Sequence, residues 1–234
     1  MASWPAPSPE ERERLFSLQE VVASEVDLED RFSEEVVAGV DQAFISGEDG
    51  REMVISGAVA FDSFLRPISK SWALLETTFP YLPGLLSFRE GPAAMEAVKR
   101  LETRPTLLFV DGCGINHPRK AGLASSIGVA LNLPTVGVSK NILCGTFDPP
   151  GRVGDASPLF FEGKHVGYIL FSKIFSKKRC RPIVVAPGHW VSVESALDLA
   201  RRHLRDHKLP EPCFMAHQHV NQVKCQILSG ELSF

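Results

Sequence analysis

The run Leu-Leu-Phe-Val at residues 107–110 constrains the fold of this chain more than any other stretch. It is continuously apolar and ends at Asp111, a pattern typical of a strand buried on both faces. Helical patterns over residues 91–103 and 122–131 flank it, and residues 134–138 have the pattern of another short strand. Strands that alternate with helices in this way predict a sheet with parallel strands and helices on its faces.

The first third of the chain has a different pattern. A short β-branched run at residues 36–40 ends at Asp41. After a glycine-containing turn at 44–51, residues 52–62 have the pattern of a longer strand, and 64–78 add a third extended piece. Consecutive strands without intervening helices predict an antiparallel start. The predicted fold class is therefore α/β, with a mixed central sheet flanked by helices.

The N-terminus is predicted to be a flexible tail followed by a helix. Residues 1–9 carry three prolines, and Ser8 precedes Pro9 in the order typical of a helix N-cap and first turn. The helix is expected to span residues 9–27. Its expected apolar face consists of Leu15, Leu18, Val21 and Val22.

The second half of the chain is predicted to continue the same domain. The expected elements are a hairpin of residues 159–161 and 165–171, a strand at 183–185 and an amphipathic helix at 192–207. The segment after Leu209 has weak patterning. Because no repeat or linker divides the chain, residues 10–234 are predicted to form a single domain.

The charge composition bears on whether the protein binds nucleic acid. The formal net charge of the 234 residues is −3, so the chain lacks the overall basic surplus common in nucleic-acid-binding proteins, although a local basic patch is compatible with it. Two basic clusters are present, and each is explained equally well as a binding patch or as solvent-exposed surface. They are Lys173, Lys177, Lys178, Arg179 and Arg181, and then Arg201, Arg202 and Arg205.

Cysteine usage and hydropathy bear on the compartment. Five cysteines without Cys-x-x-Cys spacing argue against a disulfide framework and against a zinc site, and they favour a reducing, cytoplasmic location. No apolar run approaches the length of a membrane span, and the proline-rich, charged N-terminus does not resemble a signal peptide.

Two predicted strands end in an aspartate. Asp41 follows Val-Val-Ala-Gly-Val, and Asp111 follows Leu-Leu-Phe-Val and precedes Gly112. Ligands bind at the carboxyl ends of strands in open α/β sheets, so both carboxylates are expected at a crevice. Each aspartate taken singly is also compatible with a turn or cap.

Glu90 is a third candidate acid. It precedes the helical pattern at 91–103, where a surface glutamate is favoured by the helix dipole in any case. Together with Asp41 and Asp111 it supplies the oxygen ligands that Mg²⁺ prefers, and such a metal would serve phosphodiester hydrolysis.

The segment 114–143 adds basic groups. His117 and Arg119 follow the Asp111 strand in a loop suited to phosphate contacts, and Lys140 ends the next strand, where its charge would stabilise a scissile phosphate. For Lys140 alone, a solvent-facing lysine with a buried stem is the competing reading.

These pieces, in this order, resemble the endonuclease V family of inosine-specific nucleases (deoxyinosine 3′ endonucleases). The matching segments, which span most of residues 36–217, are GVDQAF (39–44), PYLPGLLSFREGP (80–92), VDGCGINHPRKAGLAS (110–125), PTVGVSK (134–140), PGH (187–189) and LPEP with a later AH (209–217).

The resemblance implies a ribonuclease H-like fold and a role for each matching residue. Asp41, Glu90 and Asp111 match the metal-binding acids, with Mg²⁺ as the expected metal and Mn²⁺ as its substitute. Lys140 matches the lysine near the scissile phosphate. His217 matches a histidine that would position or activate the attacking water.

Substrate recognition is implied by two further groups of residues. Pro80, Tyr81, Leu82 and Pro83 match a loop that wedges into the duplex. The residues that match the hypoxanthine pocket, built mainly from backbone, are Gly84, Leu86, Gly112, Gly122 and Leu123.

The chain departs from the family pattern at two positions. Ser126 stands where the family commonly has a histidine that helps to hold substrate, and Phe214 stands where it has an arginine. These changes bear on substrate affinity and strand preference. His219 lies two residues after His217 and competes with it for the same role, while His189 is expected to be structural.

The implied function is cleavage of the second phosphodiester bond 3′ to deoxyinosine, which would initiate DNA repair. The enzyme is expected to be a monomer. DNA is favoured as substrate, and inosine-containing RNA is the alternative. Two rivals stay open: another ribonuclease H-like nuclease that acts on flaps or junctions, and a non-catalytic lesion-binding protein.

Overall fold

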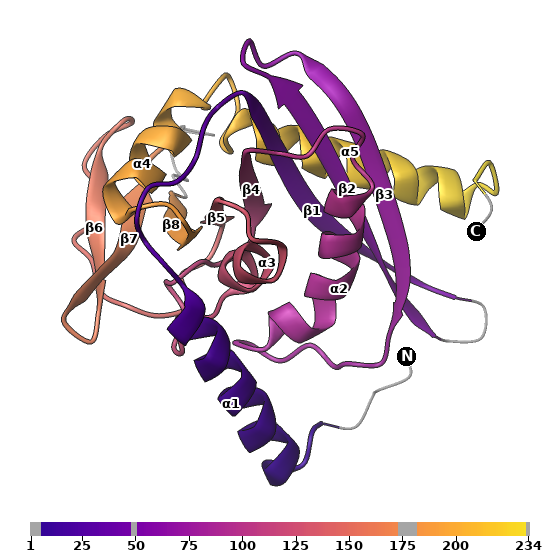
Figure 1. The fold of residues 1–234 in the computed structure, drawn as a ribbon, viewed down its shortest axis with the longest axis horizontal. Helices are drawn as coiled ribbons and strands as arrows, with labels where there is room; N and C mark the ends of the chain where they lie inside the picture. The colour runs from indigo at the N-terminus through magenta and orange to yellow at the C-terminus, as the bar shows by residue number, and fades with distance from the viewer. Residues whose placement is uncertain (1–5, 48–50, 173–181, 233–234) are drawn as a thin grey trace.

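A computed structural model describes residues 6–47, 51–172 and 182–232. One continuous mixed sheet forms its centre, and helices cover both faces (Figure 1). The strands, in sequence order, are β1 (Val36–Ser46), β2 (Glu52–Asp62), β3 (Pro67–Thr77), β4 (Leu107–Asp111), β5 (Thr135–Ser139), β6 (Ala156–Phe161), β7 (Lys164–Leu170) and β8 (Ile183–His189). The helices are α1 (Pro9–Glu25), α2 (Leu86–Lys99), α3 (Leu123–Leu131), α4 (Val193–Arg202) and α5 (Glu211–Leu228).

The strand order is β3-β2-β1-β4-β5-β8-β7-β6. The central strands β1, β4 and β5 are parallel, and every other pairing is antiparallel. This arrangement confirms the predicted α/β class with its antiparallel start, and the predicted strand at 52–62 has the bounds of β2.

Each face of the sheet has its own apolar core. Val37, Leu107 and Phe109 pack toward α4 and the start of α5. Their strand neighbours Ala38 and Leu108 point to the opposite face, toward α2 and α3. Strands buried on both faces explain why the run at 107–110 is continuously apolar.

The prediction that the first strand ends at Asp41 was wrong. β1 continues to Ser46, and Asp41 pairs with Gly57 in the middle of the β1–β2 ladder. Asp and Gln are weak strand formers, so the local sequence signalled an end, but pairing with β2 overrides that preference. The parallel partner β4 does stop at this level, because its last pair with β1 is Val40 with Val110.

The chain after Leu209 holds a long helix that weak patterning did not predict. α5 has 18 residues, and its buried positions recur at helical spacing. They are Pro212, Cys213, Ala216, Val220, Val223 and Ile227. Alanine and cysteine are weak apolar signals among the polar residues of this segment, which is why the period was missed.

Other boundaries also differ from the predictions. α2 begins at Leu86 rather than at residue 91, so Glu90 lies inside the helix, and α4 ends at Arg202 rather than at residue 207. The expected apolar face of α1 is not buried: Leu18 is 48% exposed and Val21 56% exposed. α1 lies at the periphery of the molecule, at the bottom of Figure 1, where little of its surface meets the sheet layers.

Of the two basic clusters, the one at 173–181 falls outside the described residues. Arg201 and Arg202 end α4, where Arg202 pairs with Glu34 at 2.9 Å and Arg201 donates to the Gly154 carbonyl. Cys113, Cys144, Cys213 and Cys225 are free thiols, and Cys180 falls outside the described residues.

Candidate active site

Three acidic side chains from three elements line one groove. Asp41 comes from β1, Asp111 from the end of β4 and Glu90 from α2. The parallel register of β1 and β4 brings Asp41 and Asp111 to the same level, because the preceding residues Val40 and Val110 are paired. The groove has a volume of about 330 Å³ and also contains Lys140.

The acids repel one another electrostatically. Burial, together with the charges of Asp41 and Asp111, raises the pKa of Glu90 to about 7 in spite of the opposing charge of Arg89. Burial and the charge of Asp41 also raise the pKa of Asp111. Burial is the larger cause of both shifts, and the charges of the neighbouring carboxylates add to it.

Lys140 and His217 are the polar partners of the two aspartates. Lys140 Nζ lies 2.7 Å from Asp111 Oδ2. Burial of Lys140 acts to lower its pKa, but the charge and the hydrogen bond of Asp111 act against burial, and the pKa is raised. His217, on α5, places Nδ1 2.7 Å from Asp41 Oδ2, and this hydrogen bond raises the pKa of His217. The missed helix α5 therefore carries a side chain into the predicted site.

Of the two competing histidines, only His217 contacts an acid of the groove. His219 Nε2 lies 2.9 Å from the Ser71 carbonyl oxygen, on β3. The spacing of two residues on a helix points the two rings in different directions.

The acids fit a hard divalent cation in donor chemistry. All three supply carboxylate oxygens, and the raised pKa values of Glu90 and Asp111 mark charge that a cation would offset. Among the described residues, no three His, Cys, Asp or Glu side chains stand close enough together to hold an ion as they are oriented. In this structure Asp111 is paired with Lys140 and Asp41 with His217.

The predicted wedge loop connects β3 to α2. Tyr81 is 65% exposed at its tip, and Tyr81 and Pro83 both border the groove of the acids. Pro80 faces a second groove on the other side of the loop, and Leu82 accepts the Leu85 N–H through its carbonyl oxygen at 3.0 Å. An exposed aromatic on a loop pinned by two prolines is free to contact a ligand at low entropic cost.

The predicted pocket residues do come together. A small cavity of about 50 Å³ adjoins the groove and is lined by all five of them, Gly84, Leu86, Gly112, Gly122 and Leu123, together with His117, Glu90 and Asp111. α2 begins at this cavity without a side-chain cap, so the N–H groups of its first turn have no side-chain acceptor. At Gly122 a Cβ atom would lie 2.2 Å from the Cys113 carbonyl oxygen, so glycine permits the close approach of α3 to the β4 loop.

His117 lines the pocket and Arg119 contacts the carbonyl oxygen of the pocket residue Gly84, and neither is oriented as a phosphate ligand. The His117 ring is 3% exposed, and burial lowers its pKa to about 4. Both side chains bond the Gly84 carbonyl oxygen: His117 Nε2 lies 3.0 Å from it and Arg119 Nη2 3.1 Å from it. The sequence placed them in a loop suited to phosphate contacts, whereas in the structure both side chains turn to the Gly84 carbonyl oxygen.

The two departures from the family pattern lie outside the groove lining. Phe214 stacks on His207 with ring centroids 3.5 Å apart, and Ser126 is half-buried on α3. His189 is 4% exposed and accepts a hydrogen bond from the Asp27 N–H, as expected for a structural residue.

Several groove residues were missed by sequence reasoning. Lys140 was recognised, but the three residues after it also line the groove. Their position directly after a candidate site residue was the available signal. The missed lining residues of the groove and the pocket are Gln42, Ser87, Cys113, Ala121, Ser139, Asn141, Ile142 and Leu143.

Comparison with known families gives a direct result: residues 20–218 match the family model described as Endonuclease V. This chain belongs to the endonuclease V family. It is therefore an endonuclease, a hydrolase of phosphodiester bonds. The endonuclease V of Xanthomonas campestris is 43% identical to it over 203 residues, which cover 85% of this chain and 83% of the relative.

Solved endonuclease V structures share the fold. That of Streptomyces avermitilis is 31% identical, with a TM-score of 0.81 and 97% of each chain covered. That of Ciona intestinalis, in complex with a 23mer DNA containing an inosine followed by a ribo-adenosine, is 22% identical, with a TM-score of 0.77 and coverage of 94% of this chain and 100% of the other.

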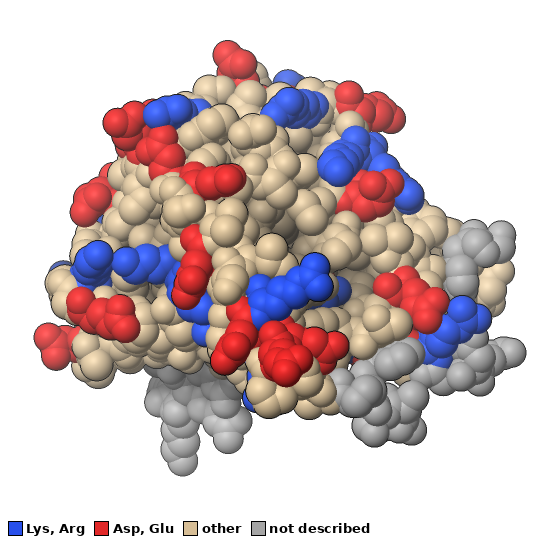
Figure 2. Space-filling model, turned by 60° about the horizontal axis from the view of Figure 1, so that its bottom comes forward, with Lys and Arg blue, Asp and Glu red and all other residues tan. Residues whose placement is uncertain are grey.

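The surface of this endonuclease V carries mixed charge. Figure 2 shows Lys and Arg interspersed with Asp and Glu on the face in view, and uncharged residues across its middle. Attraction for a polyanion at this face therefore depends on local groups rather than on a continuous basic surface. None of the helices within the described ranges is long and apolar enough to cross a membrane.

Proposed function

We propose that this endonuclease V recognises deoxyinosine in DNA and hydrolyses the second phosphodiester bond 3′ to it, leaving 3′-hydroxyl and 5′-phosphate ends. One observation carries the proposal. Asp41, Glu90, Asp111 and Lys140 line a groove that is continuous with a small pocket at the uncapped start of α2. Cleavage chemistry and base recognition would thus sit side by side.

Asp41, Glu90 and Asp111 would hold Mg²⁺, with Mn²⁺ as an effective substitute because it shares the preference for oxygen ligands. The bound metal would supply an activated water and charge stabilisation at the leaving oxygen. For the acids to take up that role, Asp111 must turn from Lys140, whereas Asp41 would keep its hydrogen bond to His217.

Lys140 and His217 would then act on the substrate side of the groove. A released Lys140 ammonium would lie against the scissile phosphate and offset its charge. His217 would position or activate the attacking water. Its Nδ1 is committed to Asp41, which leaves Nε2, faced by Asn221 at 3.2 Å, as the nitrogen for that contact.

The pocket would read the flipped hypoxanthine. Uncapped N–H groups at the start of α2 would donate to the 6-oxo group, and the close approach at Gly122 would leave little room for the 2-amino group of guanine. Extrusion of a base costs a few kcal/mol, and the cost is lowest at a weak pair such as one with inosine. Tyr81, with its flanking prolines, would fill the vacated space.

DNA is the favoured substrate, and inosine-containing RNA is the alternative. A relative of the same fold is known in complex with inosine-containing DNA, and this supports an inosine-directed site without deciding the sugar. The experiment that tests the proposal uses matched DNA and RNA oligonucleotides with one inosine, incubated with the enzyme and Mg²⁺. The expected product is a cut at the second bond 3′ to inosine, and the same oligonucleotide with adenosine should stay intact.

Two rival functions are tested by the same assay. A structure-specific nuclease would cut a flap or junction without inosine at least as fast as the inosine strand. A non-catalytic lesion binder would retain the inosine strand without cutting it. Cleavage of the inosine strand alone would support the inosine-directed nuclease. We further propose that it initiates repair in the cytoplasm as a monomer with one catalytic domain over residues 10–234. Sedimentation would check the monomeric state.

A further inference from the structure

α1 is attached to the pocket through one buried polar side chain. Gln19 is 1% exposed and is the buried residue of α1, whereas its neighbour Leu18 is half exposed. A helix of a globular protein normally buries an apolar stripe, so a glutamine as the buried anchor is unusual. Burial of an amide is tolerated when its hydrogen bonds are made inside the protein.

Both ends of the Gln19 amide are bonded. Gln19 Oε1 accepts from Arg119 Nε at 2.6 Å, and Gln19 Nε2 donates to the Gly84 carbonyl oxygen at 2.9 Å. Because Arg119 can only donate, the amide orientation is fixed by this network. The Arg119 guanidinium is in turn held over the Phe16 ring, one turn earlier on α1.

The Gly84 carbonyl oxygen receives three donors in all. Besides Gln19, Arg119 Nη2 lies 3.1 Å away and His117 Nε2 3.0 Å away. His117 Nδ1 accepts from the Arg119 N–H at 3.1 Å, so the proton of the neutral ring is on Nε2, which donates. A carbonyl oxygen has two lone pairs, so this acceptor is saturated and its direction is fixed from three sides.

Gly84 is the joint between the wedge loop and the pocket. It follows Pro83, has a φ of +80° that favours glycine, and lines both the pocket and the groove. The other end of the wedge loop is held in the same manner, since the buried Arg89 donates to the Phe79 carbonyl oxygen and pairs with Glu52 at 2.6 Å.

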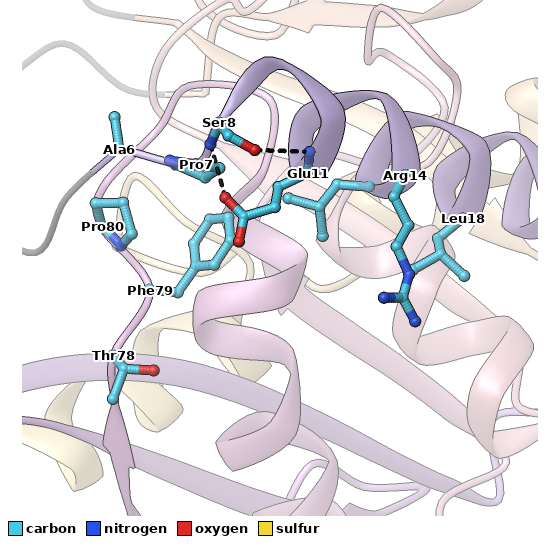
Figure 3. Close-up of a pocket in the computed structure, with 10 residues that line it drawn as sticks. Ala6, Pro7, Ser8, Glu11, Arg14, Leu18, Thr78, Phe79 and Pro80 are labelled. Atoms are coloured by element: carbon cyan, nitrogen blue, oxygen red, sulfur yellow. Dashed lines mark hydrogen bonds between the residues drawn. The ribbon is translucent and has the colours of Figure 1, made fainter.

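Elsewhere α1 and the wedge loop are separated by open space. A groove of about 560 Å³ runs between the first half of α1 and residues Thr78–Pro80. Figure 3 shows Arg14 and Leu18 on the α1 side of this groove and Phe79 and Pro80 on the other. The Gln19 amide thus supplies a fixed polar link from α1 to the joint, without close packing along this length.

We propose that Gln19 is a positioning residue for base recognition: by fixing the Gly84 carbonyl oxygen it sets the spacing between the wedge loop and the first turn of α2. The inference rests on the proposed inosine recognition. Gln19 contacts none of the acids of the groove, so its effect falls on binding of the extruded base rather than on the hydrolytic step.

The test compares Gln19→Met, Gln19→Glu and Ser8→Ala in the full-length protein. Methionine keeps the volume but removes both hydrogen bonds. Glutamate keeps an acceptor for Arg119 but loses the donor to Gly84. Ser8→Ala removes the capping box of α1, shown by the dashed lines in Figure 3, about three turns away from Gln19.

With an inosine oligonucleotide, both Gln19 variants should raise KM about tenfold, because both lose the buried hydrogen bond to the Gly84 carbonyl oxygen, while kcat stays within about twofold. Ser8→Ala should leave KM unchanged. If Gln19→Glu behaves like the parent, Gln19 serves only to anchor α1 through Arg119, and the proposal is overturned. An equal rise of KM in Ser8→Ala would overturn it as well.

Hydrogen exchange gives a readout that is independent of the substrate. A peptide covering residues 80–88 should exchange faster in Gln19→Met than in the parent or in Ser8→Ala. Unchanged exchange in Gln19→Met would overturn the positioning role whatever the enzyme cleaves. If instead the parent fails to cut the inosine strand, the proposed function fails, and the exchange result still decides the role of Gln19.

Discussion

His217 Nδ1 lies 2.7 Å from Asp41 Oδ2 and so joins α5 to β1 across 176 positions of the sequence. Asn221, one turn further along α5, lies 3.2 Å from the other ring nitrogen through its side-chain amide. His217 therefore orients the Asp41 carboxylate, and Asn221 in turn orients the His217 ring. Such hydrogen-bonded partners are common around metal-binding carboxylates.

This contact predicts the effect of His217→Ala. Loss of the ring frees the Asp41 carboxylate to turn, so the cleavage rate should fall about 10–100-fold while binding of the inosine strand in Ca²⁺ changes little. Single-turnover cleavage and gel retardation measure the two effects. His219→Ala is the matched control, because that ring bonds the Ser71 carbonyl oxygen and should leave cleavage intact.

Asp41→Asn and Asp111→Asn should each abolish cleavage, by about 10³-fold or more, because each removes a charged oxygen ligand from the groove. Retention of the inosine strand should persist in part, and chelation of metal in the parent should reproduce the loss until Mg²⁺ or Mn²⁺ is restored. Asp198→Asn, at an exposed site on α4, serves as control. Full activity in either site variant would remove that residue from the catalytic set.

Tyr81→Ala should weaken recognition of the inosine strand, with KM raised about tenfold, and leave metal binding unchanged. The side chain is 65% exposed, so the free energy of unfolding should change by no more than about 0.5 kcal/mol. Tyr81→Phe keeps the ring and should behave like the parent. The measurement is the rate of inosine-strand cleavage at limiting enzyme concentration. Equal rates for the alanine variant and the parent would count against the role of Tyr81 as a wedge.

His117 predicts a pH dependence of stability. Burial lowers its pKa from 6.5 to about 4, so the unfolded chain takes up a proton at this ring at a higher pH than the folded protein. The contribution of the neutral His117 ring to the free energy of unfolding is complete above pH 6.5. It declines as the pH falls toward about 4 and does not change further below that. The difference corresponds to about 3 kcal/mol at most.

Urea unfolding at pH 7.5 and pH 4.5 measures this contribution. The stability lost by the parent between the two values should exceed the loss in His117→Asn. Equal losses in the parent and in His117→Asn would show that this ring does not titrate as its burial requires.

Gly122→Ala tests the close approach at the pocket. Its Cβ would lie 2.2 Å from the Cys113 carbonyl oxygen and 2.5 Å from that of Gly114, so backbone must shift. The free energy of unfolding should fall by about 1–3 kcal/mol, and inosine cleavage should fall with it. Gly151→Ala meets only the Asp155 carboxylate at 3.5 Å and should be tolerated, as thermal unfolding of both variants would show.

Local patterns predicted most of the strands and helices, though not α5, and placed the acids along the chain. Apolar runs of strand length between helical patterns set the mixed α/β sheet, and the segments around Asp41, Glu90, Asp111 and Lys140 indicated the family and the groove. These features are local: they depend on residue type and spacing within a few positions, which the sequence displays directly.

The contacts of those side chains depend on tertiary packing. Pairing with β2 carries β1 past Asp41, and the packing of α5 brings His217 rather than His219 to that carboxylate. Burial turns His117 inward, and the fold brings Gln19 to the Gly84 carbonyl oxygen, 65 positions away. The physical reason is that burial and hydrogen-bond partners depend on distant segments, so no local pattern encodes them.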